Sequence, residues 1–189
     1  LKEYLAANDM DAPIVPVSAR TGAGMKELQS LMHGILLDAP ERKDYGRPRL
    51  FVDRVFSLSG FGTIVTGTLI DGNLHRGARV EILPAEISAR VRGLQSFGED
   101  LENVGPGNRV AVNLSGVSVE DIQRGMTLVL PESYQTTDSI CVRLLCVPGA
   151  HIDIVHNMQA KLFHGAAQVQ ARIRLLGGEV IQAGGQGYL

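Results

Sequence analysis

The chain has 189 residues and a formal net charge of −2. Hydrophobic residues make up 44% of it and charged residues 20%, which favours a packed core over disorder. The small net charge excludes a global basic field, so binding of nucleic acid must use local patches. The sequence shows no signal peptide and no apolar run long enough to span a bilayer, which predicts a soluble, cytoplasmic protein with no membrane partner.

Residues 1–37 are predicted to form a helix, a short buried strand and a second helix. Apolar spacing places these elements at Leu1, Tyr4 and Leu5, at Ile14–Val17, and at Leu28, Leu31, Met32 and Ile35. This order is typical of the last unit of a doubly wound α/β sheet. One strand cannot form a parallel sheet, and the chain begins with Leu. We therefore expect the remnant of an α/β domain whose front lies outside the sequence.

The polar, Pro- and Gly-rich residues 38–49 are predicted to be a linker, after which the hydrophobic period changes to two. Turn signals such as Asp71-Gly72-Asn73 and Gly105-Pro106-Gly107 separate the apolar segments. Short strands with such turns predict a small closed β-barrel over residues 50–131. The expected strands lie near residues 50–58, 63–70, 78–83, 89–95, 108–114 and 126–130.

A second β-region is predicted over residues 132–189, with strands near 139–147, 158–164, 167–176 and 179–183. Another strand is expected to begin at Gly187-Tyr188-Leu189. A barrel without its last strands would leave an exposed edge. We therefore expect an incomplete second barrel, whose missing strands lie beyond the sequence or come from a neighbouring chain. The predicted fold class is mainly β: two consecutive β-barrels, the second incomplete, preceded by a helix-strand-helix remnant.

The segment RLFVDRVFSLSGFGTIVTGTL, residues 49–69, is predicted to be a β-hairpin that bends at Gly60-Phe61-Gly62. It resembles the hairpin that opens the first β-barrel behind the GTPase domain of translation factors. Further strings make the chain similar to the selenocysteine-specific elongation factors over nearly its whole length. These strings are residues 49–56, 83–84, 89–95, 107–116, 121–125, 163–169 and 171–176.

The resemblance implies a three-domain GTPase core followed by an extension that reads an mRNA hairpin. Residues 1–37 then correspond to the end of the GTPase domain, 50–131 to the first barrel (domain II) and 132–189 to part of the second (domain III). Such a factor binds selenocysteinyl-tRNA and delivers it to the ribosome in a GTP-dependent manner. Two alternatives remain open: another translational GTPase, similar to elongation factor Tu or an initiation factor, and a β-barrel protein-interaction module without an RNA role.

The loop at Ser18, Ala19 and Arg20 resembles the last guanine-recognition loop of GTPases, where backbone N–H groups meet the guanine carbonyl oxygen. A Ser N-cap with a glycine turn before a helix gives a similar string. The sequence contains no G-x-x-x-x-G-K-[ST] motif and no Asn-Lys-x-Asp motif. We therefore expect no enzyme activity from this chain itself, and the resemblance assigns GTP and Mg²⁺ to its parent.

Two arginines are candidates for the aminoacyl pocket. Arg54 shares its strand parity with Leu50, Val52 and Phe56, so it is expected on an apolar face, where a charge needs a partner. That partner is Asp53 or another barrel carboxylate or, as the resemblance implies, an anionic selenolate. Arg109 has the opposite parity to the apolar residues of its strand and is expected to face outward, either solvated or in the same pocket. A seryl group in place of the selenocysteinyl group would leave the two cations without an anionic partner, which would disfavour binding of the wrong aminoacyl-tRNA.

The resemblance places the slot for the terminal adenosine of the tRNA at Gln95 and Phe97, since an amide can pair with a base or ribose and an aromatic ring can stack on one. Phe97 as barrel core is the alternative. Five cationic side chains are candidates for tRNA phosphates, with scattered surface charge as the alternative: Arg90, Arg92, Lys161, Arg172 and Arg174. The histidines are not spaced as metal ligands, and no catalytic constellation is visible, so we expect neither a metal site nor catalytic residues.

Overall fold

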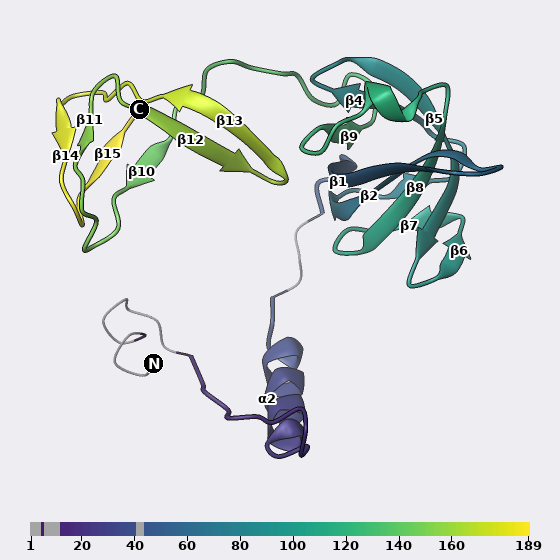
Figure 1. The fold of residues 1–189 in the computed structure, drawn as a ribbon, viewed down its shortest axis with the longest axis horizontal. Helices are drawn as coiled ribbons and strands as arrows, with labels where there is room; N and C mark the ends of the chain where they lie inside the picture. Colours follow the sequence, from purple (N-terminus) through teal and green to yellow (C-terminus); the bar gives the residue numbers. More distant parts are fainter. Residues whose placement is uncertain (1–4, 6–11, 41–43) are drawn as a thin grey trace. The chain divides into compact units, whose positions relative to one another are not determined.

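The computed structural model describes residues 5, 12–40 and 44–189 (Figure 1). The chain divides into two compact units, Leu1–Arg42 and Lys43–Leu189, and each is considered by itself. All β-strands among the described residues lie in the second unit. The fold is mainly β, as the sequence predicts.

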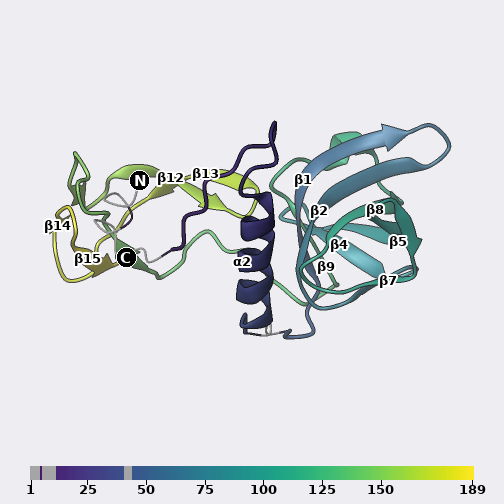
Figure 2. The same cartoon turned by 90° about the horizontal axis from the view of Figure 1, so that it is seen from below.

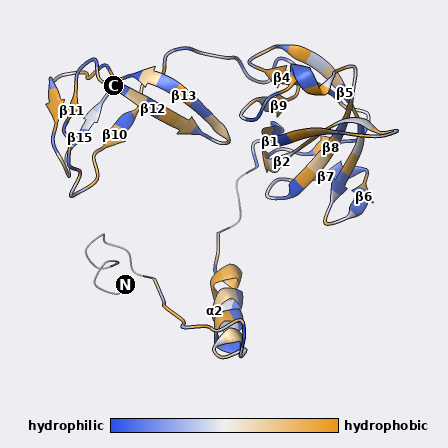
Figure 3. Cartoon of the chain, viewed as in Figure 1, coloured by the Kyte–Doolittle hydropathy of each residue, from blue (hydrophilic) through white to orange (hydrophobic). Residues whose placement is uncertain are grey.

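The first unit contains helix α2 (Met25–Leu37), which confirms the helix predicted from Leu28 to Ile35. The helix begins after Gly24, whose φ of 74° places it in the left-handed region. No residue of α2 is buried, and Figure 3 shows its C-terminal turns in the hydrophobic colour. The first helix predicted from Leu1 to Leu5 lies outside the described residues, except for Leu5.

The buried strand predicted at Ile14–Val17 is wrong as a description of this chain. Residues 12–18 carry no strand assignment, and Pro16 and Val17 are exposed. A β-strand needs a neighbour to accept and donate its backbone hydrogen bonds. The described residues of this unit supply no such neighbour, so the apolar run stays in an irregular conformation.

A six-stranded barrel forms the first part of the second unit (Figure 2). The sheet order is β4-β9-β1-β2-β8-β5, and an additional β4–β5 pairing closes the ring. Each strand matches one of the six predicted segments. The strands are β1 (Arg49–Leu58), β2 (Gly62–Asp71), β4 (Arg79–Leu83), β5 (Ile87–Ser96), β8 (Arg109–Ser115) and β9 (Thr127–Val129).

Three further short strands border this barrel, and none of them was predicted from the sequence. β6 (Glu99–Leu101) extends the sheet beside β5, and β3 (Leu74–His75) pairs with β7 (Asn103–Val104). Strands of two or three residues are too short for an alternating hydrophobic pattern to be visible. A 3-10 turn, η1 (Val119–Asp121), lies between β8 and β9.

The barrel interior is a continuous apolar core. Apolar and polar residues alternate along the strands, as the hydropathy colours show (Figure 3). Fully buried side chains come from every strand of the ring, so closure removes a large apolar area from water. They include Leu50, Val52, Val65, Leu69, Val80, Ile82, Val91, Leu94, Val112, Leu114 and Leu128.

Two β-bulges change which face the strand residues occupy. In β1 the pairing with β2 passes from Val52–Gly67 to Arg54–Thr66, so Asp53 is an extra residue. In β5 the pairing with β8 passes from Val91–Leu114 to Gly93–Asn113, so Arg92 is an extra residue. A bulge shifts the side-chain alternation by one residue. Downstream residues of both strands therefore point to the opposite face from the one that simple parity predicts.

The second β-region consists of three two-stranded sheets, β10–β15, β11–β14 and β12–β13. Its small core contains Cys146, Ile173, Leu175 and Ile181. The strand predicted to begin near Gly187 is present as β15, whereas several others are shorter than expected. The strands are β10 (Arg143–Leu145), β11 (Ile154–Val155), β12 (Gln159–His164), β13 (Ala167–Arg172), β14 (Val180–Ile181) and β15 (Gln186–Tyr188).

Candidate functional site

An open pocket of about 300 Å³ lies on the outer face of the first barrel, where β2, β5 and β8 meet. Three residues that the sequence analysis assigned to two separate functions line it together: Arg109, Gln95 and Phe97. The remaining lining residues are Thr66, Ser96, Gly98, Val110 and Ala111. The fold therefore brings the predicted aminoacyl-pocket arginine and the predicted tRNA-end residues into one site.

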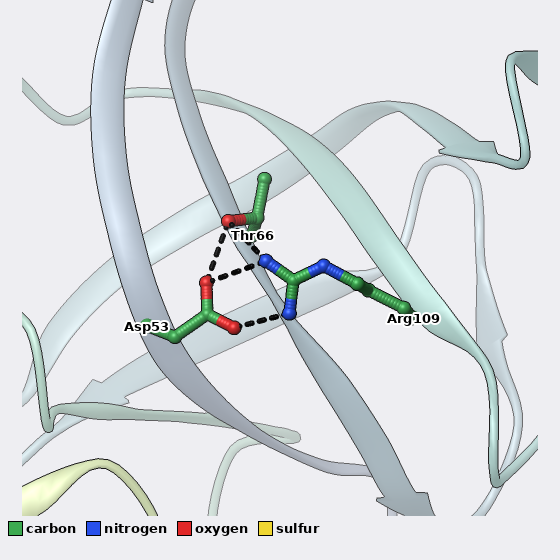
Figure 4. Close-up of polar contacts among 3 residues, drawn as sticks. All are labelled: Asp53, Thr66 and Arg109. Carbon is green, nitrogen blue, oxygen red and sulfur yellow. Dashed lines mark hydrogen bonds and ion pairs between the residues drawn. The ribbon is translucent and has the colours of Figure 1, made fainter. Parts of the chain in front are cut away.

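Arg109 projects outward at the start of β8, as predicted, and its guanidinium binds the carboxylate of Asp53 in a bidentate manner (Figure 4). One nitrogen, Nη1, donates to Asp53 Oδ2, and Nη2 donates to Asp53 Oδ1 at 3.0 Å. Thr66 joins them, since its hydroxyl donates to Asp53 Oδ1 at 2.7 Å and accepts from Nη2 at 3.4 Å. A fork-to-fork ion pair of this kind holds both groups in a fixed orientation.

Each member of this ion pair stabilises the charged form of the other. The hydrogen bond from Arg109 holds the pKa of the Asp53 carboxyl below its ordinary value, against a smaller opposing effect of burial. The Thr66 hydroxyl and the nearby positive charge of Arg54 lower it further. The same hydrogen bond raises the pKa of Arg109. The side chains are 53% exposed for Arg109 and 28% for Asp53, so solvent reaches the pair and can be replaced there by a ligand.

The predicted position of Arg54 on the apolar face is wrong. The bulge at Asp53 turns Val55, rather than Arg54, toward the core, and Arg54 is exposed. Arg54 is paired directly with Thr66, so the two side chains share the outer face. The register thus places Arg54 and Arg109 on the same face, on either side of Thr66. Among the described residues, Asp53 forms its ion pair with Arg109 and not with Arg54.

Phe97 is 92% exposed, so the alternative that it belongs to the barrel core is excluded. It occupies the tip of the two-residue β5–β6 hairpin with Gly98, and both residues have positive φ, 51° and 84°. This pair of conformations is that of a type I′ turn, in which Asn or Gly is favoured and a bulky side chain is strained. The turn holds an aromatic ring in solvent at the pocket rim.

Gln95 faces outward because the bulge at Arg92 intervenes between it and the buried Val91. Its side-chain amide donates to Asp100 Oδ1 at 3.4 Å, a weak contact that leaves the amide accessible. Beneath it, the buried hydroxyl of Ser96 donates to the backbone oxygen of Arg109 at 2.7 Å. This bond ties the hairpin that carries Gln95 and Phe97 to the strand that carries Arg109.

The five cationic candidates for phosphate contacts are all exposed. Arg90 and Arg92 lie on β5, outside the pocket lining. Lys161 and Arg172 alternate with the facing pair Ala160–Ala171 on the β12–β13 hairpin, so they share one face. Arg174 follows β13 and alternates with the buried Ile173 and Leu175.

The loop predicted to meet a guanine base forms a compact turn in the first unit. The Ser18 N–H donates to the Ala23 carbonyl at 3.0 Å, and the Ser18 hydroxyl accepts from the Thr21 N–H at 3.3 Å. Within the described residues, the N–H groups of Ala19 and Arg20 have no intramolecular acceptor. Both residues are exposed, so the loop has donors of the kind that a guanine carbonyl oxygen requires.

Sequence reasoning missed Thr66 and considered Asp53 only as a partner of Arg54. Neither residue carries a motif of its own, and only the strand register brings them to Arg109. In the described part of the chain, no group of three or more His, Cys, Asp or Glu side chains could hold a metal ion. None of the helices described here is long and apolar enough to cross a membrane.

Residues 62–129 match the family Elongation factor Tu domain 2. The closed barrel and this match define a translation-factor β-barrel domain. The selenocysteine-specific elongation factor of Desulfomicrobium baculatum is 37% identical over 97% of this chain, and that of Methanocaldococcus jannaschii is 32% identical over 64%. The chain belongs to the family of selenocysteine-specific elongation factors.

Solved structures agree with this assignment. The crystal structure of a bacterial selenocysteine-specific elongation factor matches 94% of the chain with a TM-score of 0.82 and 26% identity. The elongation factor SelB of Methanococcus maripaludis, in complex with the GTP analogue GppNHp, matches 94% with a TM-score of 0.69 and 25% identity. The chain spans 29% of the Desulfomicrobium baculatum relative and 30% and 42% of the two structures.

Proposed function

We propose that this chain is the part of a selenocysteine-specific elongation factor that holds the aminoacyl end of selenocysteinyl-tRNA for delivery to the ribosome. The observation that carries the proposal is the pocket in which Arg109, Gln95 and Phe97 converge. A cation beside an amide and an exposed aromatic ring suits an anionic aminoacyl group attached to a terminal nucleoside. Arg54 supplies a second positive charge on the same face.

The aminoacyl group is recognised by charge. A selenol is more acidic than a thiol, whose pKa is about 8.5, and is therefore an anion at neutral pH. A selenolate can compete with the Asp53 carboxylate for the guanidinium of Arg109, with Arg54 adding to the attraction. The neutral hydroxyl of serine cannot displace a charged, bidentate partner. Asp53 thus keeps the arginine satisfied when the wrong aminoacyl group is present, and discrimination arises from this exchange of partners.

Other parts of the activity belong to the parent factor. The Ser18–Arg20 loop has backbone donors that fit a guanine carbonyl oxygen, but this sequence contains no motif for the phosphates or for Mg²⁺. GTP would supply the signal that times release of the tRNA. Lys161, Arg172 and Arg174 are proposed to contact the tRNA backbone, and an mRNA hairpin would be read by an extension of the parent. We expect such a factor to work in the cytoplasm.

Removal of the pocket cations tests the amino-acid assignment. Arg109→Ala and Arg54→Ala in the full-length factor are expected to weaken binding of selenocysteinyl-tRNA by about 1.5–3 kcal/mol, or roughly 10- to 150-fold. Seryl-tRNA should bind almost unchanged. Arg76→Ala is the matched control, because its guanidinium already pairs with Glu102 away from the pocket. Equilibrium binding of both aminoacyl-tRNAs measures the preference, and unchanged discrimination in both variants would count against the pocket.

The aromatic ring at the hairpin tip is tested by Phe97→Asn. Asn is favoured in the left-handed conformation, so the variant keeps the turn and should stabilise the barrel by about 0.5–1 kcal/mol. Loss of the ring should weaken tRNA binding by about 1–3 kcal/mol, the usual worth of base stacking on an aromatic side chain. Thermal unfolding and tRNA titration give the two values. Tight binding by a stabilised Phe97→Asn protein would exclude stacking.

A further inference from the structure

Two arginines face each other across the outer surface of the first barrel, at a distance from the pocket. Arg79 of β4 is directly paired with Arg90 of β5, and the next pair, Val80–Ala89, is buried. Alternation along the strands therefore points both arginines outward. Directly opposed side chains in an antiparallel pair lie about 5 Å apart at Cβ, where like charges repel. An anion bound between the two guanidinium groups would remove this repulsion.

No acidic side chain in the described part of the chain forms an ion pair with either arginine. Glu81, the next outward residue of β4, is beyond ion-pair distance of both. Their neighbour Arg76 differs, because its Nη1 lies 2.9 Å from Glu102 Oε1 and its Nε donates to the Arg92 backbone oxygen at 3.0 Å. The Arg79–Arg90 pair is thus an uncompensated double cation in a chain whose net charge is −2.

β5 connects this pair to the pocket. Arg90, the bulge residue Arg92 and Gln95 are all exposed along this strand. Gln95 lies five positions after Arg90, which corresponds to about 16 Å of extended strand. A polynucleotide whose end lies beside Gln95 and Phe97 can therefore run along β5 and reach the arginine pair within its last few nucleotides.

We propose that Arg79 and Arg90 together bind the phosphodiester backbone of the RNA strand whose 3′ end fills the pocket. The inference rests on the proposed function of that pocket. Guanidinium groups match the geometry of phosphate oxygens, and such contacts position an RNA without reading its sequence. The pair therefore adds affinity for any aminoacyl-tRNA, whereas Arg109 distinguishes the aminoacyl group.

Arg79→Gln, Arg90→Gln and the double variant in the full-length factor test the proposal, with Arg76→Gln as a control of equal charge change on the same edge. Each single variant should weaken tRNA binding about 3- to 10-fold, equally for selenocysteinyl- and seryl-tRNA, and the double variant should lose more than either. Each single variant should also reduce the magnitude of the slope of log K against log salt by about 0.7, as expected for one lost contact to a single strand, and the double variant should reduce it by about 1.4. Arg76→Gln should change both values less. The melting temperature of the free test variants should rise, which shows that they fold and that the repulsion is real.

Binding of a tRNA that lacks its unpaired 3′ nucleotides tests whether the phosphates that contact Arg79 and Arg90 belong to this single-stranded end. On this RNA the Arg79→Gln and Arg90→Gln variants should bind like the wild type. A persistent loss would mean that the pair contacts another RNA and would overturn the assignment. Wild-type affinity and salt slope in the double variant, with intact tRNA, would overturn the proposal and leave the pocket standing. A wild-type factor that binds no tRNA would refute the proposed function and this inference together.

Discussion

The two β-regions of this chain differ in how completely their strands pair and in how large a buried core they enclose. The first closes six strands into a ring around a core of fully buried Leu, Ile and Val side chains. The second pairs its strands only two by two, around a small core that includes Cys146, Ile173 and Leu175. The proposed pocket lies on the closed barrel. Precise positioning of an ion pair such as Asp53–Arg109 needs strands whose own register is fixed by a well-packed interior.

Matched leucine truncations should give the largest difference between the regions. Leu128 of β9 is fully buried, whereas Leu175 in the second region is 7% exposed. Leu128→Ala should cost about 3–5 kcal/mol and Leu175→Ala about 2 kcal/mol, because the smaller core can relax around the missing atoms. Amide hydrogen exchange measures the opening free energy of each region separately. Equal costs would mean that the two cores are equally well packed.

A pair of glycine substitutions sharpens the same comparison. A Cβ at Gly67 of β2 would collide with the Phe51 carbonyl oxygen and lie 2.7 Å from Leu50 Cδ2, so Gly67→Ala must displace backbone. We expect it to destabilise the barrel by about 3 kcal/mol. A Cβ at Gly178, in the second region, would meet nothing within 4 Å. Gly178→Ala should change stability by less than about 0.5 kcal/mol in urea denaturation. A tolerated Gly67→Ala would show that the barrel wall is more compliant than its geometry implies.

The smallest expected effect is the loss of stability at acidic pH that follows from protonation of Asp53. Both ion pairs of the described residues, Arg76–Glu102 and Arg109–Asp53, lie in the first barrel. Because the folded pKa of Asp53 is lowered, its contribution is fully present above the unfolded value of about 3.9 and is lost as pH falls through the folded pKa. Asp53→Asn should cost about 0.5–1 kcal/mol at neutral pH, as for a partly exposed pair.

That cost should disappear in strong acid, where the wild type is protonated. Urea denaturation of the wild type and Asp53→Asn between pH 2 and pH 7 measures the difference. A constant difference across this range would show that the residue acts through packing and not through its charge.

Most of the barrel could be predicted from the sequence, because its six main strands alternate apolar and polar residues over a sufficient length. The predictions failed where tertiary structure overrides parity. Simple alternation from Val52 placed Arg54 in the core, and the extra residue Asp53 turned it outward. No pattern in the residues around Asp53 predicts such a bulge. The buried strand at Ile14–Val17 failed for the opposite reason, since its apolar residues were visible but no described strand pairs with them.

The candidate site was predictable in part. Arg109 was correctly expected to face outward, and Gln95 and Phe97, which the family resemblance assigned to one slot, both line the pocket. Their convergence with Arg109 depends on the β5–β8 pairing, which joins Gln95 to Ala111, and this long-range register is not encoded in any short string. Thr66 was missed for the same reason. The pocket is a property of the closed sheet rather than of a motif.

Closure of the barrel also limits how other molecules can bind it. The β4–β5 pairing joins the two ends of the six-stranded ring, whereas residues 54–58 of β1 pair only with β2 and the short strand β6 pairs only with β5. Addition of a strand by a partner chain, a common mode of peptide recognition, is therefore confined to these margins and cannot occur within the closed ring. A ligand of the closed ring has to be recognised by side chains on the outside of its wall rather than by the backbone of its strands.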